Sequence, residues 1–182
     1  MKRISTPVLM LMSLVLLLSL NCVAFAKPQD ADPIPAIRQQ YAAINKRAAR
    51  LRKVKKELSG FSAEGGELVA YFDGKAITKM VATYYGETGR TVEEFYYRDQ
   101  KLIFAFRKIL NYDRPLSGKV VSTSEERFYF NNDQLIRWID QDKKQVEASN
   151  PDYAAKQAEY LEYSSTFQSA ARSKARMLEA WN

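Results

Sequence analysis

The chain has 182 residues, of which 28 are Lys or Arg and 21 are Asp or Glu, and it contains one Cys and no His. Without His, it lacks the general base of Ser-His-Asp and Cys-His enzymes and the imidazole ligands of many metal sites. A single Cys forms neither an internal disulfide nor a thiolate zinc site, so we expect no metal and no cofactor.

The first 26 residues have the pattern of a secretory signal peptide. Lys2 and Arg3 form a short positive region, and residues 8–20 are almost wholly Leu, Val and Met. These 13 residues are too few for a membrane-spanning helix, which needs about 20. The Ala-Phe-Ala sequence at residues 24–26 fits the small residues that signal peptidase requires. We therefore expect residues 1–26 to be removed and the mature chain, 27–182, to be periplasmic or secreted.

Cys22 offers an alternative, in which its acylation anchors the protein as a lipoprotein. Asn21 precedes it, at a position where lipoprotein signals normally have Gly, Ala or Ser. Cleavage after residue 26 instead removes Cys22 and leaves 182 − 26 = 156 residues without a thiol. A chain of that length is expected to form one domain that is held together by its apolar core alone.

Residues 34–59 have a helical period, because apolar side chains recur at steps of three and four from Ile37 to Leu58. Pro33 marks the start of this pattern and Gly60 follows its end. Segment 34–58 has a net charge of 8 − 1 = +7, whereas the mature chain as a whole has 26 − 21 = +5. We predict a basic amphipathic helix over residues 34–59. Its charged face comprises Arg47, Arg50, Lys53 and Lys56.

Two interpretations of this basic face stay open. The charges can form an ordinary solvated helix face, in which the late Lys and Arg residues interact favourably with the helix dipole. Alternatively, the face attaches the protein to an anionic lipid, a polysaccharide or an acidic partner. We expect no nucleic-acid partner.

Between residues 67 and 140 the pattern changes to that of β-strands. This stretch holds 14 of the 21 aromatic residues of the mature chain, and short turns rich in Gly, Asp and Asn interrupt it. Such a composition is typical of antiparallel strands joined by hairpins. We predict six strands, at residues 67–72, 76–85, 91–97, 101–110, 119–130 and 134–140.

A hairpin pattern recurs within this region. Residues 95–103, FYYRDQKLI, match residues 128–136, FYFNNDQLI, and a weaker copy begins at residue 71. Each copy has an aromatic pair, a short turn and the start of a second strand. The unit resembles the hairpins of exported β-meander proteins with YD-like or MORN-like repeats. This resemblance implies an antiparallel sheet and carries no catalytic residues.

Side-chain alternation assigns two faces to these hairpins. One face is almost wholly apolar and is predicted to be the core, covered by the helices. It comprises Phe95, Tyr97, Leu102, Phe104, Phe106, Phe128, Phe130, Leu135 and Ile139. The opposite face is predicted to be exposed and to carry the candidate binding residues, which are of types common in binding hot spots. These are Tyr96, Tyr129, Trp138, Arg107 and Arg127. In the alternative interpretation, they form cross-strand pairs that stabilise a solvent-facing sheet.

The remaining sequence predicts a C-terminal helix over residues 151–181, continuous or broken near Ser164. Carboxylates at residues 93–94 and 125–126 are candidates for glycoside hydrolysis, but neighbours on a strand point to opposite faces. Glu94 and Glu125 could share the outer face, where ordinary solvated strand charges are the alternative interpretation. We therefore expect an α+β domain with a six-stranded antiparallel meander, acting as an exported, non-enzymatic binding or interaction protein of the cell envelope. Electrostatic attachment through the basic helix is the alternative, and a small hydrolase is a third.

Overall fold

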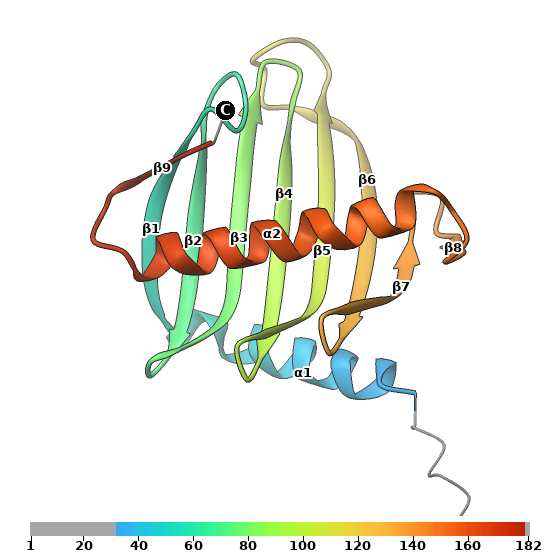
Figure 1. Cartoon of the computed structure of the whole chain (residues 1–182). Helices are drawn as coiled ribbons and strands as arrows, with labels where there is room; N and C mark the ends of the chain where they lie inside the picture. The colour runs from blue at the N-terminus through green and yellow to red at the C-terminus, as the bar shows by residue number, and fades with distance from the viewer. Residues whose placement is uncertain (1–31, 181–182) are drawn as a thin grey trace, which may run out of the picture. The chain divides into compact units, whose positions relative to one another are not determined.

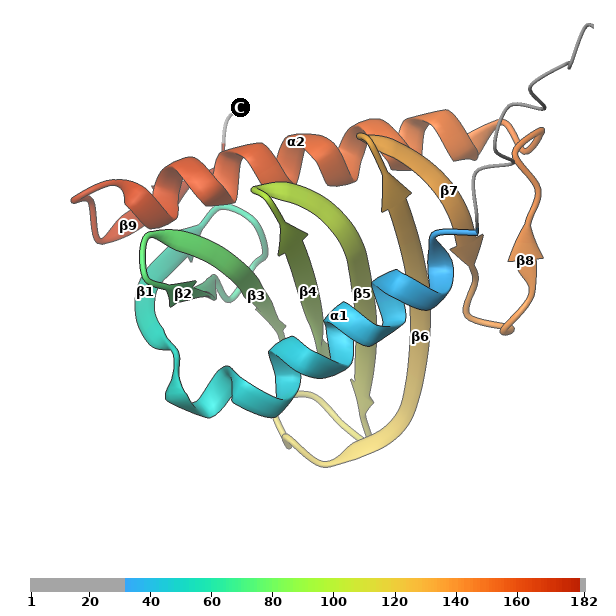
Figure 2. The same cartoon turned by 90° about the horizontal axis from the view of Figure 1, so that it is seen from below.

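The computed structural model describes residues 32–180, which form one sheet with a helix on either side (Figures 1 and 2). Within these residues the sheet has nine strands, in the order β8-β7-β6-β5-β4-β3-β2-β1-β9. The α+β class is confirmed, whereas the predicted number of six strands is wrong. The predicted signal peptide with Cys22 and the end of the predicted C-terminal helix at Trp181 lie outside the described residues.

Six of the strands are those that the sequence predicts, to within two residues at each end. They are β2 (Gly66–Asp73), β3 (Ala76–Gly86), β4 (Gly89–Arg98), β5 (Lys101–Tyr112), β6 (Val120–Asn131) and β7 (Gln134–Ile139). Three shorter or terminal strands were not predicted, β1 (Arg52–Ser59), β8 (Gln145–Val146) and β9 (Met177–Glu179). The helices are α1 (Ile34–Arg47), which a 3₁₀ turn at Ala48–Arg50 follows, and α2 (Asp152–Arg172).

The basic helix predicted over residues 34–59 is wrong in its second half. Helix α1 ends at Arg47, and β1 pairs with β2 from Arg52 opposite Phe72 to Leu58 opposite Gly66. Residues 52–58 also fit the period of two that is typical of a strand. Val54, the apolar stem of Lys56 and Leu58 point to the same face. Pairing with β2 supplies hydrogen-bond partners for the backbone N–H and C=O groups of this segment, and it therefore favours the strand over the helix.

The predicted C-terminal helix is likewise shorter than expected. Helix α2 ends at Arg172, and β9 then runs parallel to β1, with Met177 opposite Glu57. Lys56 explains the position of this end. Its buried ammonium group donates hydrogen bonds to the carbonyl oxygens of Ser173, at 2.8 Å, and Ala175. Because carbonyl groups at a helix C-terminus carry partial negative charge, Lys56 binds the end of α2 to β1.

Three hairpins of the meander have a β-bulge directly after their turns. In the second hairpin, Tyr97 pairs with Leu102 but Tyr96 pairs with Phe104, so that Ile103 is an extra residue in β5. The same irregularity adds Thr78 to β3 and Ile136 to β7. An extra residue inverts the alternation of the side chains that follow it. The repeat seen in the sequence is therefore a repeat of structure, but its faces differ from those predicted.

The two helices cover opposite faces of the sheet, as Figure 2 shows. The face under α2, called here the α2 face, holds the larger apolar cluster, which includes Phe95, Phe128 and Phe167. The face under α1, called the α1 face, holds a second cluster. It comprises Ile34, Ile37, Ile44, Tyr96, Ile103, Phe104 and Tyr129. The prediction of one Phe-rich face covered by both helices is therefore wrong.

We expect Lys56→Met to lower the free energy of unfolding by about 1–3 kcal/mol, because it leaves the carbonyl groups at the end of α2 without a charged donor. The matched control is Lys55→Met. Lys55 is 66% exposed and pairs with Glu67 at the surface, so its loss should change the free energy by less than about 0.5 kcal/mol. Urea unfolding of both variants measures the difference. Equal effects would show that the contact of Lys56 with α2 contributes nothing specific.

Candidate functional site

The five candidate binding residues do not share a face. Tyr96, Arg127 and Tyr129 lie on the α1 face, whereas Arg107 pairs with Glu93 and Glu126 on the α2 face. Trp138 also lies on the α2 face, in the larger apolar cluster. The bulges at residues 103 and 136 cause this division, because they invert the strands that carry Arg107 and Trp138. The common outer face predicted from the sequence is therefore wrong.

Tyr96 is part of the contact between α1 and the sheet. Its side chain is fully buried, and its ring centroid lies 4.8 Å from that of Tyr41 and 5.8 Å from that of Phe104. Its hydroxyl oxygen lies within hydrogen-bond distance of carbonyl and carboxylate oxygens of Asn45 and Glu94. Burial, the hydrogen bond to Glu94 and the charge of Glu94 raise the pKa of Tyr96. The residue is thus a protonated structural donor rather than a surface contact.

Lys79 completes the attachment of α1. Its buried ammonium group lies 2.9 Å from the carboxylate of Glu94 and donates a hydrogen bond to the side-chain oxygen of Asn45, at 3.0 Å. Asn45 belongs to the last turn of α1, whereas the other two residues belong to β3 and β4. Buried ion pairs with additional hydrogen bonds fix geometry well. These contacts therefore hold α1 at a defined distance from the sheet.

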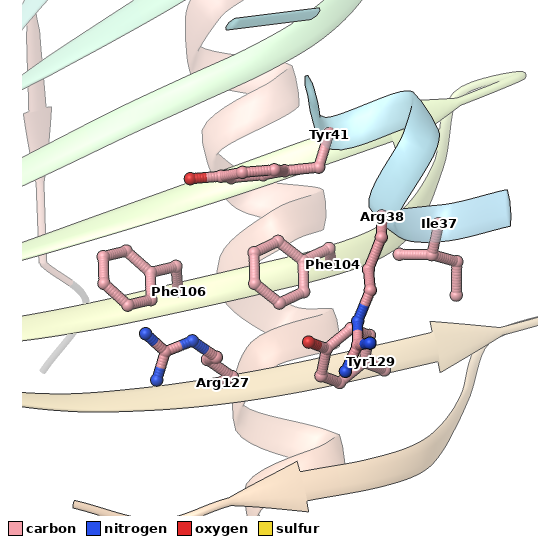
Figure 3. Close-up of a pocket in the computed structure, with 7 residues that line it drawn as sticks. All are labelled: Ile37, Arg38, Tyr41, Phe104, Phe106, Arg127 and Tyr129. Atoms are coloured by element: carbon pink, nitrogen blue, oxygen red, sulfur yellow. The ribbon is translucent and has the colours of Figure 1, made fainter. Parts of the chain in front are cut away.

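A groove opens between α1 and the neighbouring strands β5 and β6. It encloses a cavity of about 260 Å³. Figure 3 shows side chains from the helix above it and from the two strands below it. The lining residues are Ile37, Arg38, Tyr41, Phe104, Phe106, Arg127 and Tyr129. We call this site the aromatic–arginine groove.

The two arginines of the groove differ in their electrostatic surroundings. Arg127 donates a hydrogen bond to Glu125 at 2.7 Å, and its guanidinium carbon lies 5.2 Å from the ring centroid of Phe106. Arg38 is exposed, and its guanidinium carbon lies 5.9 Å from the ring centroid of Tyr129. No carboxylate of residues 32–180 forms an ion pair with Arg38. The groove therefore carries a cation from α1 that the described protein does not neutralise.

Arg107 and Trp138 belong instead to a buried polar network under α2. The Nη1 atom of Arg107 and the indole nitrogen of Trp138 both donate to the carboxylate of Glu126, at 3.3 and 3.2 Å. The Nε atom of Arg107 lies 3.6 Å from a carboxylate oxygen of Glu93. Tyr84 and Tyr160 donate their hydroxyl protons to Glu93, at 3.2 and 3.3 Å. The network places both carboxylates against one guanidinium group.

Glu93 is the most unusual acid of this network. Burial raises the pKa of its carboxyl group, although the charge of Arg107 and the hydrogen bond from Tyr84 act in the opposite direction. Its neighbour Glu94 points to the other face, where it pairs with Lys79. The expectation that adjacent glutamates cannot face one substrate is therefore confirmed. A second cavity, of about 250 Å³, opens beside Glu93.

The four residues of the predicted basic face no longer form one surface. Arg47 pairs with Asp73, at 2.5 Å, and Lys56 is buried. Arg50 and Lys53 are exposed, at the end of the 3₁₀ turn and at the start of β1. Exposed basic side chains nevertheless follow one another from the end of α1 into β1. They are Lys46, Arg47, Arg50, Arg52, Lys53 and Lys55.

Sequence reasoning missed much of the groove. The charge count over segment 34–58 does not distinguish Arg38 from the other basic residues, and the predicted alternation places Phe104 and Phe106 on the opposite face. The helical period did place Ile37 and Tyr41 on the packed side of α1. Arg38 directly follows Ile37 in the sequence and therefore lies beside the packed side of α1. This adjacency is the feature of the sequence that could have indicated Arg38 as a groove residue.

Comparisons with known proteins give no further assignment. No family model matches the chain, and no curated protein or solved structure matches it significantly. The resemblance to YD-like or MORN-like repeat proteins stays a prediction.

In residues 32–180, neither helix is long and apolar enough to cross a membrane. The same residues contain no cluster of three or more acidic or other typical side-chain ligands arranged for a metal ion.

We expect Glu93 to make the stability of the protein depend on pH. Its pKa is higher in the folded than in the unfolded chain, so the folded state binds the proton more tightly. The contribution of Glu93 to the free energy of unfolding should therefore fall as the pH rises from about 4.5 through the folded-state pKa. Urea unfolding at a series of pH values should show this trend as the difference between the wild type and Glu93→Gln.

The control is Glu57→Gln, because Glu57 is 64% exposed and contacts the solvent. Its substitution should leave the pH profile close to that of the wild type. A difference between wild type and Glu93→Gln that is constant above pH 4.5 would contradict the raised pKa of Glu93.

Proposed function

We propose that this protein is an exported, non-enzymatic binding protein of the cell envelope, and that the aromatic–arginine groove is its ligand site. The signal-peptide pattern at residues 1–26 supports export. The convergence of aromatic side chains and arginines on one cavity supports binding, because small-molecule sites are concave, mostly apolar and marked by a few polar groups.

The observation that carries this proposal is the combination, in one cavity, of aromatic rings with a cation that no carboxylate of the described residues neutralises. Five of the seven lining residues are apolar or aromatic, and Arg38 is available to a ligand. Helix α1 crosses one end of its sheet face (Figure 1), and the groove lies between this helix and strands β5 and β6. The contacts of Asn45 with Lys79 and Tyr96 hold α1 in place beside the groove without a ligand.

The chemistry of the lining residues favours binding over catalysis. None of the seven is a carboxylic acid, Ser, Thr, Cys, His or Lys, and the two residues that could act as nucleophiles, Tyr41 and Tyr129, have no carboxylate or amine among these seven to remove a proton from them. The acids that the sequence made candidates for hydrolysis lie elsewhere. Glu93 and Glu126 face Arg107 under α2, and Glu125 pairs with Arg127.

We expect the neutral fluorescent probe N-phenyl-1-naphthylamine to bind the protein with one-to-one stoichiometry. Tyr41→Ala should weaken this binding several-fold, because Tyr41 supplies a ring to the groove and is 36% exposed. The matched control is Tyr85→Ala, since Tyr85 is 41% exposed, lies on β3 and is not among the residues that line the groove. Fluorescence titration measures both affinities.

Equal affinities of Tyr41→Ala and Tyr85→Ala would contradict the proposed site. Tyr41 packs on Tyr96 and Phe104, so its loss also affects the position of α1. Far-ultraviolet circular dichroism and urea unfolding of both variants therefore accompany the titration, and binding is compared at temperatures where both are folded.

The exposed cations from the end of α1 into β1 favour a second candidate, electrostatic attachment to an anionic surface. We expect the protein to be retained on vesicles of phosphatidylglycerol at low salt, with less retention as the ionic strength rises. Lys46→Gln, Arg50→Gln and Lys53→Gln together should weaken retention by about 3 kcal/mol, since each cation near such a surface contributes about 1 kcal/mol.

A matched triple variant controls for net charge. Arg98, Arg114 and Lys144 are exposed residues outside this basic segment, and their replacement by Gln removes the same charge. Retention that does not depend on salt, or that both triple variants lose equally, argues against a specific attachment surface.

A further inference from the structure

We propose that the aromatic–arginine groove selects small apolar molecules that carry one anionic group, with Arg38 as the residue that binds the anion. This inference rests on the proposed function and specifies the ligand class. Three properties of the groove support it, namely its charge, the order of the side chains along it and its volume.

The charge of the groove favours an anion over a neutral or cationic ligand. The seven described residues that line it include two guanidinium groups and no carboxylate. Glu125 neutralises part of this charge from outside the lining, but it is shared between Arg127, at 2.7 Å, and Lys108, at 3.4 Å. Arg38 has no such partner in residues 32–180. A carboxylate or phosphate group at Arg38 would therefore gain a charge-assisted hydrogen bond without displacing an existing ion pair.

The order of the side chains gives the ligand an orientation. In Figure 3, the Arg38 side chain extends from α1 towards the Tyr129 ring, whereas the Arg127 guanidinium group lies beside Phe106. The Phe104 ring lies between these two positions, and its centroid is 5.3 Å from that of Tyr41 above it. The anionic group thus belongs at the Tyr129 end, and the apolar part of the ligand belongs over Phe104, towards Phe106.

The surroundings of Phe106 limit the length of the apolar part. In the register of the sheet, Phe106 is flanked by Glu94 on β4 and by Arg127 on β6. Glu94 pairs with Lys79, and Lys108 lies with its ammonium nitrogen 5.4 Å from the Phe106 ring centroid. Charged side chains therefore border the aromatic surface. An apolar chain that extends past Phe106 would have to displace water from these charges.

The volume agrees with a short ligand. A cavity of about 260 Å³ holds roughly nine water molecules at about 30 Å³ each. It is slightly smaller than the usual range for drug-sized ligands, about 300–1,000 Å³. Octanoate, a carboxylate on a short alkyl chain, is therefore a suitable probe.

The experiment compares three probes with the same chain and different charge, namely octanoate, octanol and octylammonium. Isothermal titration calorimetry measures their affinities, and two-dimensional NMR maps the resonances that shift. We expect octanoate to bind most tightly and to shift resonances of Arg38 and of β5 and β6 beside the groove. Arg38→Gln should weaken octanoate binding about tenfold and leave octanol unchanged.

The matched control is Arg114→Gln, because Arg114 is exposed in the loop between β5 and β6 at the other end of the sheet (Figure 1). It should leave the affinity of octanoate unchanged. Because Arg38 is exposed and forms no ion pair with another residue of 32–180, we expect its variant to fold as the wild type does, which urea unfolding checks.

The outcomes separate this inference from the proposed function. Equal affinities for octanoate and octanol, or an octanoate affinity that Arg38→Gln leaves unchanged, would overturn the anion selectivity. The groove would then remain a ligand site if Tyr41→Ala still weakened binding of the neutral probe. Absence of binding by octanoate and the neutral probe, or binding that neither Arg38→Gln nor Tyr41→Ala affects, would overturn both proposals.

Discussion

The β-bulge after each of three hairpin turns is the constraint on which the arrangement of the sheet depends. By adding Ile103 to β5, it places Phe104 on the α1 face opposite Tyr96, while Ala105 lies on the α2 face opposite Phe95. The meander therefore presents aromatic side chains on both of its faces. Each face has apolar surface that must be removed from water, which explains why α1 and α2 cover opposite sides. The space between α1 and the aromatic residues of β5 and β6 forms the groove.

The same bulge places Arg107 on the α2 face, where its side chain is partly buried and a charge without partners would be destabilising. Glu93 and Glu126 on the neighbouring strands supply the opposite charge, and the hydroxyl groups of Tyr84 and Tyr160 bind the first of these acids. Desolvation nevertheless raises the pKa of Glu93. Glu93 and Glu126 therefore have a structural role, because both carboxylates lie against the guanidinium group of Arg107.

The strands of the meander were predictable because aromatic-rich segments alternate with turns. The four turn residues at 99–100 and 132–133 have positive φ angles, and three of them are Asp or Asn, which tolerate this conformation. The faces were not predictable. A bulge depends on how two strands align, and one strand with a regular alternation carries no sign of it. Residues 52–58 were ambiguous for another reason, since their apolar positions fit both a helix and a strand. Phe104 and Phe106 were therefore assigned to the wrong face and Arg38 was not recognised, whereas Tyr129 and Arg127 do share the face on which the sequence places them.

Helix α1 contributes in two ways to the groove. Ile37 is buried against the sheet, and the next residue, Arg38, reaches the edge of the cavity. Asn45, two turns later, accepts a hydrogen bond from Lys79, has its side-chain oxygen 3.0 Å from the hydroxyl oxygen of Tyr96, and fixes the other end of the helix. A ligand in the groove would contact α1 and the strands together. Since any molecule that binds only this assembled arrangement stabilises it by mass action, ligand binding and the docking of α1 must be thermodynamically coupled.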